Sequence, residues 1–182
     1  MIKYYLAYLR FAWQTAKISM VNYITKQDKR QSLCKEAFDK LGLGIEVKGT
    51  QHSDTQMYLI NHQSMVDIFL LESISSRNLS WIAKEELKKV PFLGYMLQSF
   101  KMILLKRENK AGLRKLLKDV KNRTDDGRVV CMFPEGTRVK EQKLGKFQSG
   151  AKFIASKLDL TLQPVVVVGS HYMLDNINKK HR

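Results

Sequence analysis

A chain of 182 residues, 44% of them hydrophobic, is long enough to bury a core, and we expect one main domain. Its 32 basic and 17 acidic residues give a net charge of +15, which favours an anionic partner: nucleic acid, an anionic membrane surface or a phosphorylated substrate. The two cysteines, Cys34 and Cys131, form no recognisable metal-binding pattern, and nothing in them requires an oxidising compartment. Cys131 lies in an apolar run and is expected to be a buried free thiol.

The N-terminal residues 1–25 are rich in aromatic and aliphatic side chains, but Lys3, Arg10 and Lys17 interrupt them at regular intervals. No uncharged run approaches the roughly 18 residues that a bilayer-spanning helix needs. Because the interval is close to two helical turns, the three cations form one stripe on a largely apolar helix. This pattern favours a helix lying in a membrane interface, with its cations towards lipid phosphates. The alternative is a helix packed on the domain, with the stripe facing water.

The rest of the chain alternates short apolar runs with helical patterns, which is typical of an α/β domain. We expect residues 1–41 to form a helical membrane-associating segment and residues 42–182 to form a mixed, mostly parallel sheet flanked by helices. The predicted strands are 45–48, 57–60, 79–83, 102–105, 129–133 and 162–168. The predicted helices are 28–41, 65–73, 84–89, 95–99, 111–123 and 148–157.

Residues 61–67, Asn-His-Gln-Ser-Met-Val-Asp, place a histidine and an aspartate five positions apart, directly after an apolar run. An imidazole accepts protons near neutral pH, and an adjacent carboxylate fixes its tautomer and stabilises its charge. On one helix the two side chains would point about 140° apart, so a working pair needs a turn between them. Ser64 and Asp67 form a capping box that supplies the turn, with Ser64 as N-cap and His62 in the preceding loop. The alternative is that Asp67 only caps the helix and His62 is an ordinary loop residue.

Polar groups also follow other predicted strands, where the sites of parallel sheets gather. Lys84 follows one strand, Arg107 follows another, and the sequence Phe-Pro-Glu-Gly-Thr-Arg follows a third, at 133–138. The proline and glycine of this last segment predict a turn, and the guanidinium of Arg138 suits bidentate contact with phosphate. The alternative is a solvated basic face. We expect that for most of the cations nearby, including a helix face formed by Lys110, Arg114, Lys118 and Lys121.

Four blocks in order carry a resemblance to a known family. They are the His-x4-Asp motif at 62–67, a Lys84 to Arg107 block with a proline and a glycine inside it, the segment 133–138, and Leu-Gln-Pro-Val-Val at 162–166. The pattern spans roughly residues 57–168. It resembles the glycerolipid acyltransferases, and among them most of all the bacterial 1-acyl-glycerol-3-phosphate acyltransferases. The resemblance favours the catalytic interpretation of the histidine and aspartate.

The resemblance implies transfer of a fatty acyl group from acyl-CoA or acyl-carrier protein to the free hydroxyl of 1-acyl-glycerol-3-phosphate, forming phosphatidic acid in phospholipid biosynthesis. It implies that His62 is the general base and that Asp67 orients and stabilises it. No covalent acyl-enzyme is expected, and the chain has no Gly-x-Ser-x-Gly nucleophile elbow. No metal is implied, and no cofactor beyond the acyl donor. The residues implied for the acceptor's phosphate and glycerol are Lys84, Arg107, Glu135, Gly136, Thr137 and Arg138.

The expected partners are a lysophospholipid, the acyl donor and a membrane surface, since no nucleic-acid-binding motif is evident. The expected location is the cytoplasmic face of the bacterial inner membrane, with peripheral or monotopic attachment. Two positions depart from the family pattern, Val139 in place of serine and Gln148 in place of lysine. A different lysolipid acceptor, such as a lyso-ornithine lipid, is therefore one alternative, and a non-catalytic basic membrane-binding module is another. The chain stops 14 residues after Val168, so we expect a compact domain or a truncated one.

Overall fold

The computed structural model describes residues 13, 14, 16–18, 20, 21, 29–89, 101–105, 110–139 and 143–173. A five-stranded sheet forms its centre, with the strand order β3-β2-β4-β1-β5 and parallel pairing between all neighbours. The strands are β1 (Met57–Ile60), β2 (Leu79–Lys84), β3 (Ile103–Leu105), β4 (Val129–Met132) and β5 (Leu162–Val165). The strands that lead into the two most distinctive motifs, β1 and β4, are therefore neighbours.

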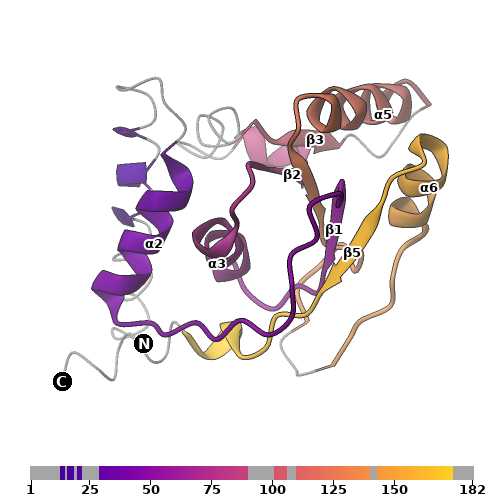
Figure 1. Cartoon of the computed structure of the whole chain (residues 1–182). Helices are drawn as coiled ribbons and strands as arrows, with labels where there is room; N and C mark the ends of the chain where they lie inside the picture. The colour runs from indigo at the N-terminus through magenta and orange to yellow at the C-terminus, as the bar shows by residue number, and fades with distance from the viewer. Residues whose placement is uncertain are drawn as a thin grey trace.

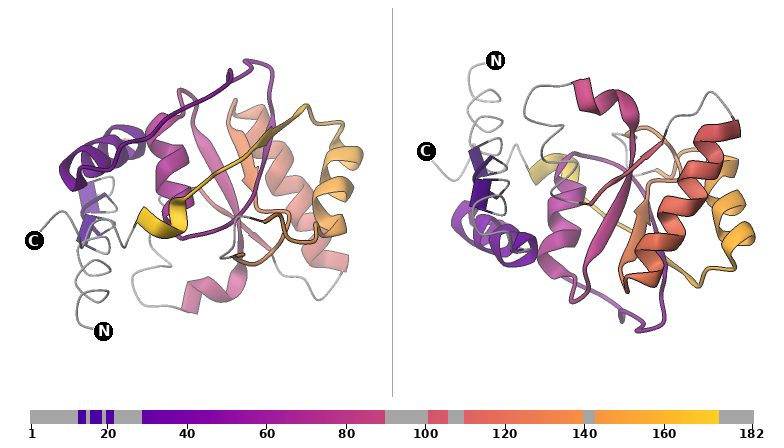
Figure 2. Two further views of the ribbon diagram at one scale, coloured as in Figure 1. Left: turned by 90° about the horizontal axis from the view of Figure 1, so that it is seen from below. Right: turned by 90° about the horizontal axis from the view of Figure 1, so that it is seen from above.

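Helices cover both faces of the sheet, as Figures 1 and 2 show. On one face lie α2 (Arg30–Leu41) and α3 (Val66–Ile74), and on the other lie α5 (Lys110–Asp125) and α6 (Ser149–Leu158). Successive side chains of a strand point to opposite faces, so each face has its own apolar cluster. Cys131 packs with α2 and α3, for example, whereas Val130 packs with α5 and α6.

The central strand β4 shows why this arrangement forms. All four of its residues are apolar and buried, and a strand covered on both faces needs such a run without polar alternation. Its valines also favour the extended backbone. The edge strand β5 instead alternates between exposed and half-buried residues.

The predicted α/β fold with a mostly parallel sheet is confirmed, and five predicted strands coincide with β1 to β5 within a few residues at their ends. The predicted strand at 45–48 is wrong. Leu43 and Ile45 do pack against the core, but residues 43–48 form an extended connection that pairs with no strand among the described residues. The predicted helix at 84–89 is a 3-10 helix, η1 (Glu85–Lys89), and the one predicted at 95–99 lies outside the described residues.

The described part of the N-terminal segment is helical, and it has two different sides. Ile18 is only 2% exposed and belongs to the core cluster of α2, while Lys17 Nζ lies 3.5 Å from Oε1 of Glu36 on α2. Trp13 and Met20 are instead 71% and 59% exposed. One side therefore packs on the domain, and the predicted membrane association stays a prediction. The other two cations of the predicted stripe, Lys3 and Arg10, lie outside the described residues.

Within the described ranges, no helix combines the length and the apolar character that crossing a membrane requires. The cationic helix face predicted around residues 110–121 is found on α5, where Arg114, Lys118 and Lys121 are exposed. Cys131 is a buried free thiol, as predicted.

Candidate active site

His62 lies just beyond the carboxyl end of β1, in the loop that joins this strand to α3. The neighbouring strands are β4 on one side and β5 on the other. Because the carboxyl ends of parallel strands meet at one edge of a sheet, the loops that follow these strands gather around His62. Segments far apart in the sequence, at 62–67, 133–139 and 167–171, therefore come together there.

The predicted pair of His62 and Asp67 is formed. His62 Nδ1 lies 2.8 Å from Oδ2 of Asp67. The aspartate side chain is fully buried, whereas the histidine side chain is 16% exposed. Donation from Nδ1–H to the carboxylate fixes the tautomer in which Nε2 carries the lone pair. Nε2 has no hydrogen-bond partner among the described residues.

The backbone holds the Asp67 carboxylate in place. Oδ2 also accepts the backbone N–H groups of Gln63 at 2.8 Å and Ser64 at 3.0 Å. Hydrogen bonds to an ionised acceptor are stronger than those between neutral groups. Asp67 is therefore oriented by its own turn, independently of any substrate.

The turn between the two residues is the predicted one, with a shifted helix boundary. α3 starts at Val66 with Met65 as its N-cap, so the prediction of Ser64 as N-cap is wrong by one residue. Met65 has helical backbone angles, φ −61° and ψ −23°, whereas a cap residue is usually non-helical, so the two boundaries differ only in whether the turn at Met65 is counted as helix. Ser64 still acts at the helix start, because its Oγ accepts the N–H of Val66 at 3.3 Å.

An aromatic stack supports the imidazole. The rings of His62 and Phe133 lie 3.7 Å apart between centroids, with 16° between their planes. Phe133 stacks in turn on Trp81 of β2, at 5.3 Å and 26°. Asp67 thus fixes one edge of the imidazole and Phe133 fixes one face. Sequence reasoning missed both aromatic residues, because the stack depends on β2, β4 and β1 being consecutive in the sheet.

The loop after β4 holds the backbone of His62. Glu135 is 5% exposed, and its Oε1 accepts the N–H of His62 at 2.8 Å. Its Oε2 accepts the N–H of Gly145 at 2.7 Å. The carbonyl of His62 accepts the N–H of Val139 at 2.8 Å. This clamp is a role that the sequence did not reveal, and the predicted contact of Glu135 with the acceptor's glycerol stays a prediction.

The remaining residues predicted to bind the acceptor lie at the same edge of the sheet, with one not described. Gly136 forms the predicted turn at φ +69°, where its N–H donates to the carbonyl of Phe133 at 3.0 Å. Thr137 and Arg138 follow it and are exposed. Lys84 is exposed at the carboxyl end of β2, next to β4. Arg107 lies outside the described residues.

Both neighbours of His62 in the sequence anchor the segment after β5. The amide of Asn61, 6% exposed, accepts the N–H of Val167 at 2.7 Å and donates to its carbonyl at 2.9 Å. Gln63 Oε1 lies 3.3 Å from Nδ1 of His171. Sequence analysis did not single out these contacts. The loop that carries His62 is therefore fixed to the segment after β5 as well as to the loop after β4.

Two further observations concern metal ligands and pockets. No group of three or more His, Cys, Asp or Glu side chains within the described residues is arranged to hold a metal ion. A pocket of about 270 Å³ lies beside α6, lined by Leu59 and Leu162 among others. Leu59 packs with α5 and α6, so this pocket lies across the sheet from Asp67 and α3.

Comparisons with known proteins relate this chain to acyltransferases. A family model described as Acyltransferase matches residues 44–168. A 1-acyl-sn-glycerol-3-phosphate acyltransferase of Helicobacter pylori is 38% identical over 160 residues, covering 85% of this chain and 68% of that protein. A chloroplastic protein of the same name from Arabidopsis thaliana is 32% identical and covers 69% of this chain.

A solved structure also matches. The crystal structure of the 1-acyl-sn-glycerophosphate acyltransferase of Thermotoga maritima aligns with a TM-score of 0.65 and 28% identity, covering 79% of this chain and 58% of that one. The chain spans only 36% of the Arabidopsis protein, so these relatives are longer. The family model nevertheless covers well over half of the chain, including the histidine–aspartate pair and the turn after β4. The chain belongs to the acyltransferase family.

Proposed function

We propose that this protein transfers a fatty acyl group from a thioester to the free hydroxyl of 1-acyl-glycerol-3-phosphate, forming phosphatidic acid. The observation that carries the proposal is the contact between His62 Nδ1 and Asp67 Oδ2 at 2.8 Å, with no hydrogen-bond partner for Nε2 among the described residues. The names of the Helicobacter, Arabidopsis and Thermotoga relatives support the choice of acceptor.

The reaction needs one proton to move twice. Nε2 of His62 takes the proton of the acceptor hydroxyl as its oxygen attacks the thioester carbonyl. Asp67 stabilises the imidazolium that forms. The tetrahedral intermediate then expels the thiolate, which receives the proton from Nε2, leaving the ester and a free thiol. The N–H groups of Gln63 and Ser64 are already bonded to Asp67, so we expect the donors for the intermediate's oxyanion to come from other groups.

Cations at the same sheet edge suit the acceptor's phosphate. Lys84 and Arg138 are exposed there, and a guanidinium can bind phosphate oxygens in pairs. Arg107, which follows β3 in the sequence, is the third expected ligand. We infer that these residues set the distance between the phosphate and the hydroxyl that reaches Nε2.

The acyl donor is acyl-CoA or acyl-carrier protein, and the reaction takes place at an anionic membrane surface. The net charge of +15 and the exposed Trp13 and Met20 support attachment to such a surface. We place the protein at the cytoplasmic face of the bacterial inner membrane, attached peripherally or monotopically.

An acceptor screen with a labelled long-chain acyl thioester tests the proposal. We expect labelled phosphatidic acid from 1-acyl-glycerol-3-phosphate and little product from a lyso-ornithine lipid or a lysolipid with a larger head group. His62→Ala and Asp67→Asn should each lower kcat by about a hundredfold or more, because the first removes the base and the second removes its stabilising charge. Activity should also fall on acidification, since a protonated imidazole cannot accept a proton. Undiminished turnover by His62→Ala would sink the assignment, and better turnover of another lysolipid would change the acceptor.

A further inference from the structure

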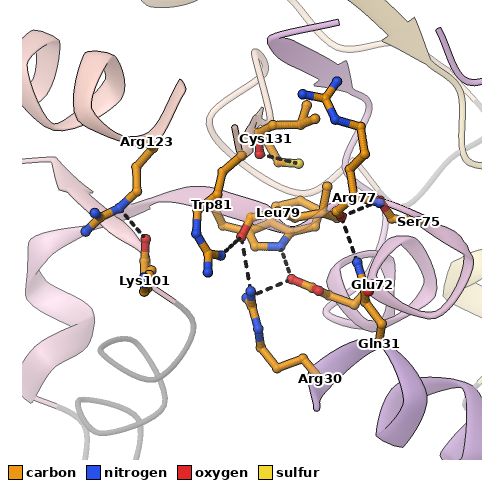
Figure 3. Close-up of polar contacts among 12 residues, drawn as sticks. Arg30, Gln31, Glu72, Ser75, Arg77, Leu79, Trp81, Lys101, Arg123 and Cys131 are labelled. Carbon is orange, nitrogen blue, oxygen red and sulfur yellow. Dashed lines mark hydrogen bonds and ion pairs between the residues drawn. The ribbon is translucent and has the colours of Figure 1, made fainter. Parts of the chain in front are cut away.

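A buried polar network beneath the active site joins α2, α3 and β2 (Figure 3). Its members are Arg30, Glu72 and Trp81, which are 1%, 0% and 1% exposed. Oε1 of Glu72 accepts the indole Nε1–H of Trp81 at 3.0 Å and also the Nη1 of Arg30 at 3.1 Å. Nη2 of Arg30 donates to the carbonyl of Leu79 at 3.3 Å. The polar edge of the indole is therefore fixed by a carboxylate that is itself held by a guanidinium.

The ring of the same tryptophan leads to the catalytic histidine. Trp81 stacks on Phe133, with centroids 5.3 Å apart, and Phe133 stacks on His62, with centroids 3.7 Å apart. A continuous series of contacts thus runs from Arg30 through Glu72, Trp81 and Phe133 to the imidazole. Each contact has a direction, because a hydrogen bond or a ring stack restricts rotation as well as distance.

Stability alone does not explain this choice of residues. Replacing a buried ion pair with apolar side chains of similar volume is often neutral or stabilising, because desolvation offsets the attraction. A leucine or phenylalanine in place of Trp81 would also fill the core. A buried indole, however, needs an acceptor for its N–H, and that acceptor fixes the plane and rotation of the ring. The network supplies an orientation that an apolar core would not.

We propose that Trp81 is a positioning residue for His62, which it holds through Phe133, and that Glu72 and Arg30 set the orientation of the indole. The inference rests on the proposed function, in which Nε2 of His62 must meet the acceptor hydroxyl at hydrogen-bond distance. A shift of the imidazole plane moves Nε2 while leaving the predicted phosphate ligands at 84 and 138 in place. The loss should therefore appear in kcat rather than in KM.

Variants of the whole protein test this by steady-state kinetics. Trp81→Leu removes the stack, and we expect kcat to fall by about ten- to a hundredfold with KM for both substrates nearly unchanged. Trp81→Phe keeps a ring and loses only its tether to Glu72, so its kcat should lie between those of the wild type and Trp81→Leu. The control is Val120→Ala on α5, a fully buried position across the sheet, which lowers stability without touching the stack. Its kcat should match the wild type.

A second measurement does not depend on activity. The ring current of Phe133 shifts the Hε1 resonance of His62, which can be assigned among the four histidines by comparison with His62→Ala. We expect Trp81→Leu to move this resonance towards the value of free histidine and Val120→Ala to leave it in place. An unmoved resonance in folded Trp81→Leu overturns the proposal, whatever the kinetics. If Trp81→Leu does not fold, Trp81→Phe and Glu72→Gln take its place. The proposal is overturned if both of these variants keep the wild-type Hε1 resonance of His62 and the wild-type kcat. A moved resonance in a protein without acyl transfer would refute the proposed function and leave the positioning intact.

Discussion

Oε1 of Glu135 accepts the backbone N–H of His62 at 2.8 Å, across 73 residues of sequence. The other carboxylate oxygen accepts the N–H of Gly145, and the N–H of Val139 donates to the carbonyl of His62. The loop after β4 therefore holds the proposed base by both of its backbone groups. A displacement of this loop would therefore also displace His62.

Replacing Glu135 should affect catalysis more than binding. Glu135→Ala leaves the N–H groups of His62 and Gly145 without their acceptor, and we expect the free energy of unfolding to fall by about 1–3 kcal/mol. We also expect kcat to fall by about tenfold or more, because a displaced His62 misaligns Nε2. Glu135→Gln retains one carbonyl oxygen, so its free energy of unfolding and its kcat should both fall less than those of Glu135→Ala. Urea unfolding and steady-state kinetics measure these effects.

The kinetics of Glu135→Gln separate two roles for this residue. If Glu135 clamps His62, the loss falls on kcat. If its carboxylate instead binds the acceptor's glycerol, KM for the lysolipid rises while kcat stays close to that of the wild type.

Gly145 has no room for a side chain. A Cβ at this position would lie 2.5 Å from Oε2 of Glu135 and 2.9 Å from Cγ2 of Val139. Gly145→Ala should therefore push the carboxylate away from its donors and reproduce part of the loss in kcat caused by Glu135→Ala. The matched control is Gly44→Ala, where an added Cβ meets nothing within 4 Å. Equal activity in the two alanine variants would contradict the clamp.

The buried ion pair gives a stability prediction that is independent of activity. Arg30→Met leaves Glu72 buried without the guanidinium and should lower the free energy of unfolding by about 3–5 kcal/mol. The double variant Arg30→Met/Glu72→Met removes both charges but also takes the acceptor from the indole N–H of Trp81, so we expect only part of that loss to be recovered. Urea unfolding of Arg30→Met, Glu72→Met and the double variant measures the coupling. Additive losses would show that the two side chains do not act as a pair.

The buried thiol of Cys131 gives a pH dependence. Burial, reinforced by the nearby carboxylate of Glu72, raises the pKa of Cys131 well above its usual range. Above about pH 8.5 the unfolded chain releases a proton that the folded protein retains, so the free energy of unfolding should decrease as pH rises. The effect is at most about 1.4 kcal/mol per pH unit. Urea unfolding between pH 7 and 9.5 measures how steeply the free energy of unfolding falls with pH. We expect a smaller slope for Cys131→Ala than for the wild type. Identical slopes would show that this thiol does not contribute.

Local patterns predicted the elements of this fold and the contact between His62 and Asp67. The apolar run at 57–60 is β1, and the pattern of residues 61–67 requires a turn that the structure contains. Both predictions depend on neighbours in the sequence, since hydrogen bonding and side-chain direction repeat over a few residues. The strand predicted at 45–48 was wrong because it relied on local information alone. An alternating pattern of side chains does not show whether another strand lies alongside to pair with it.

The supporting contacts could not be predicted in this way. The stack of His62 on Phe133 and the clamp by Glu135 require β1 to lie next to β4, although β2 and β3 intervene in the chain. Strand order is a property of the whole sheet, and no local spacing encodes it. Trp81 was visible as an apolar residue of a strand, but its partner Glu72 belongs to a helix whose packing is decided by the complete core.

The helix α2 lies outside the span matched by the acyltransferase family model, which begins at residue 44. Yet Cys34 and Phe38 share a core cluster with Trp81, and Arg30 donates to Glu72. A protein shortened to the matched span would retain His62 and Asp67. It would, however, expose the apolar side chains that α2 covers and lose the guanidinium of Arg30 that binds Glu72. The smallest piece expected to fold and turn over substrate therefore begins before residue 30, upstream of the span that the family model matches.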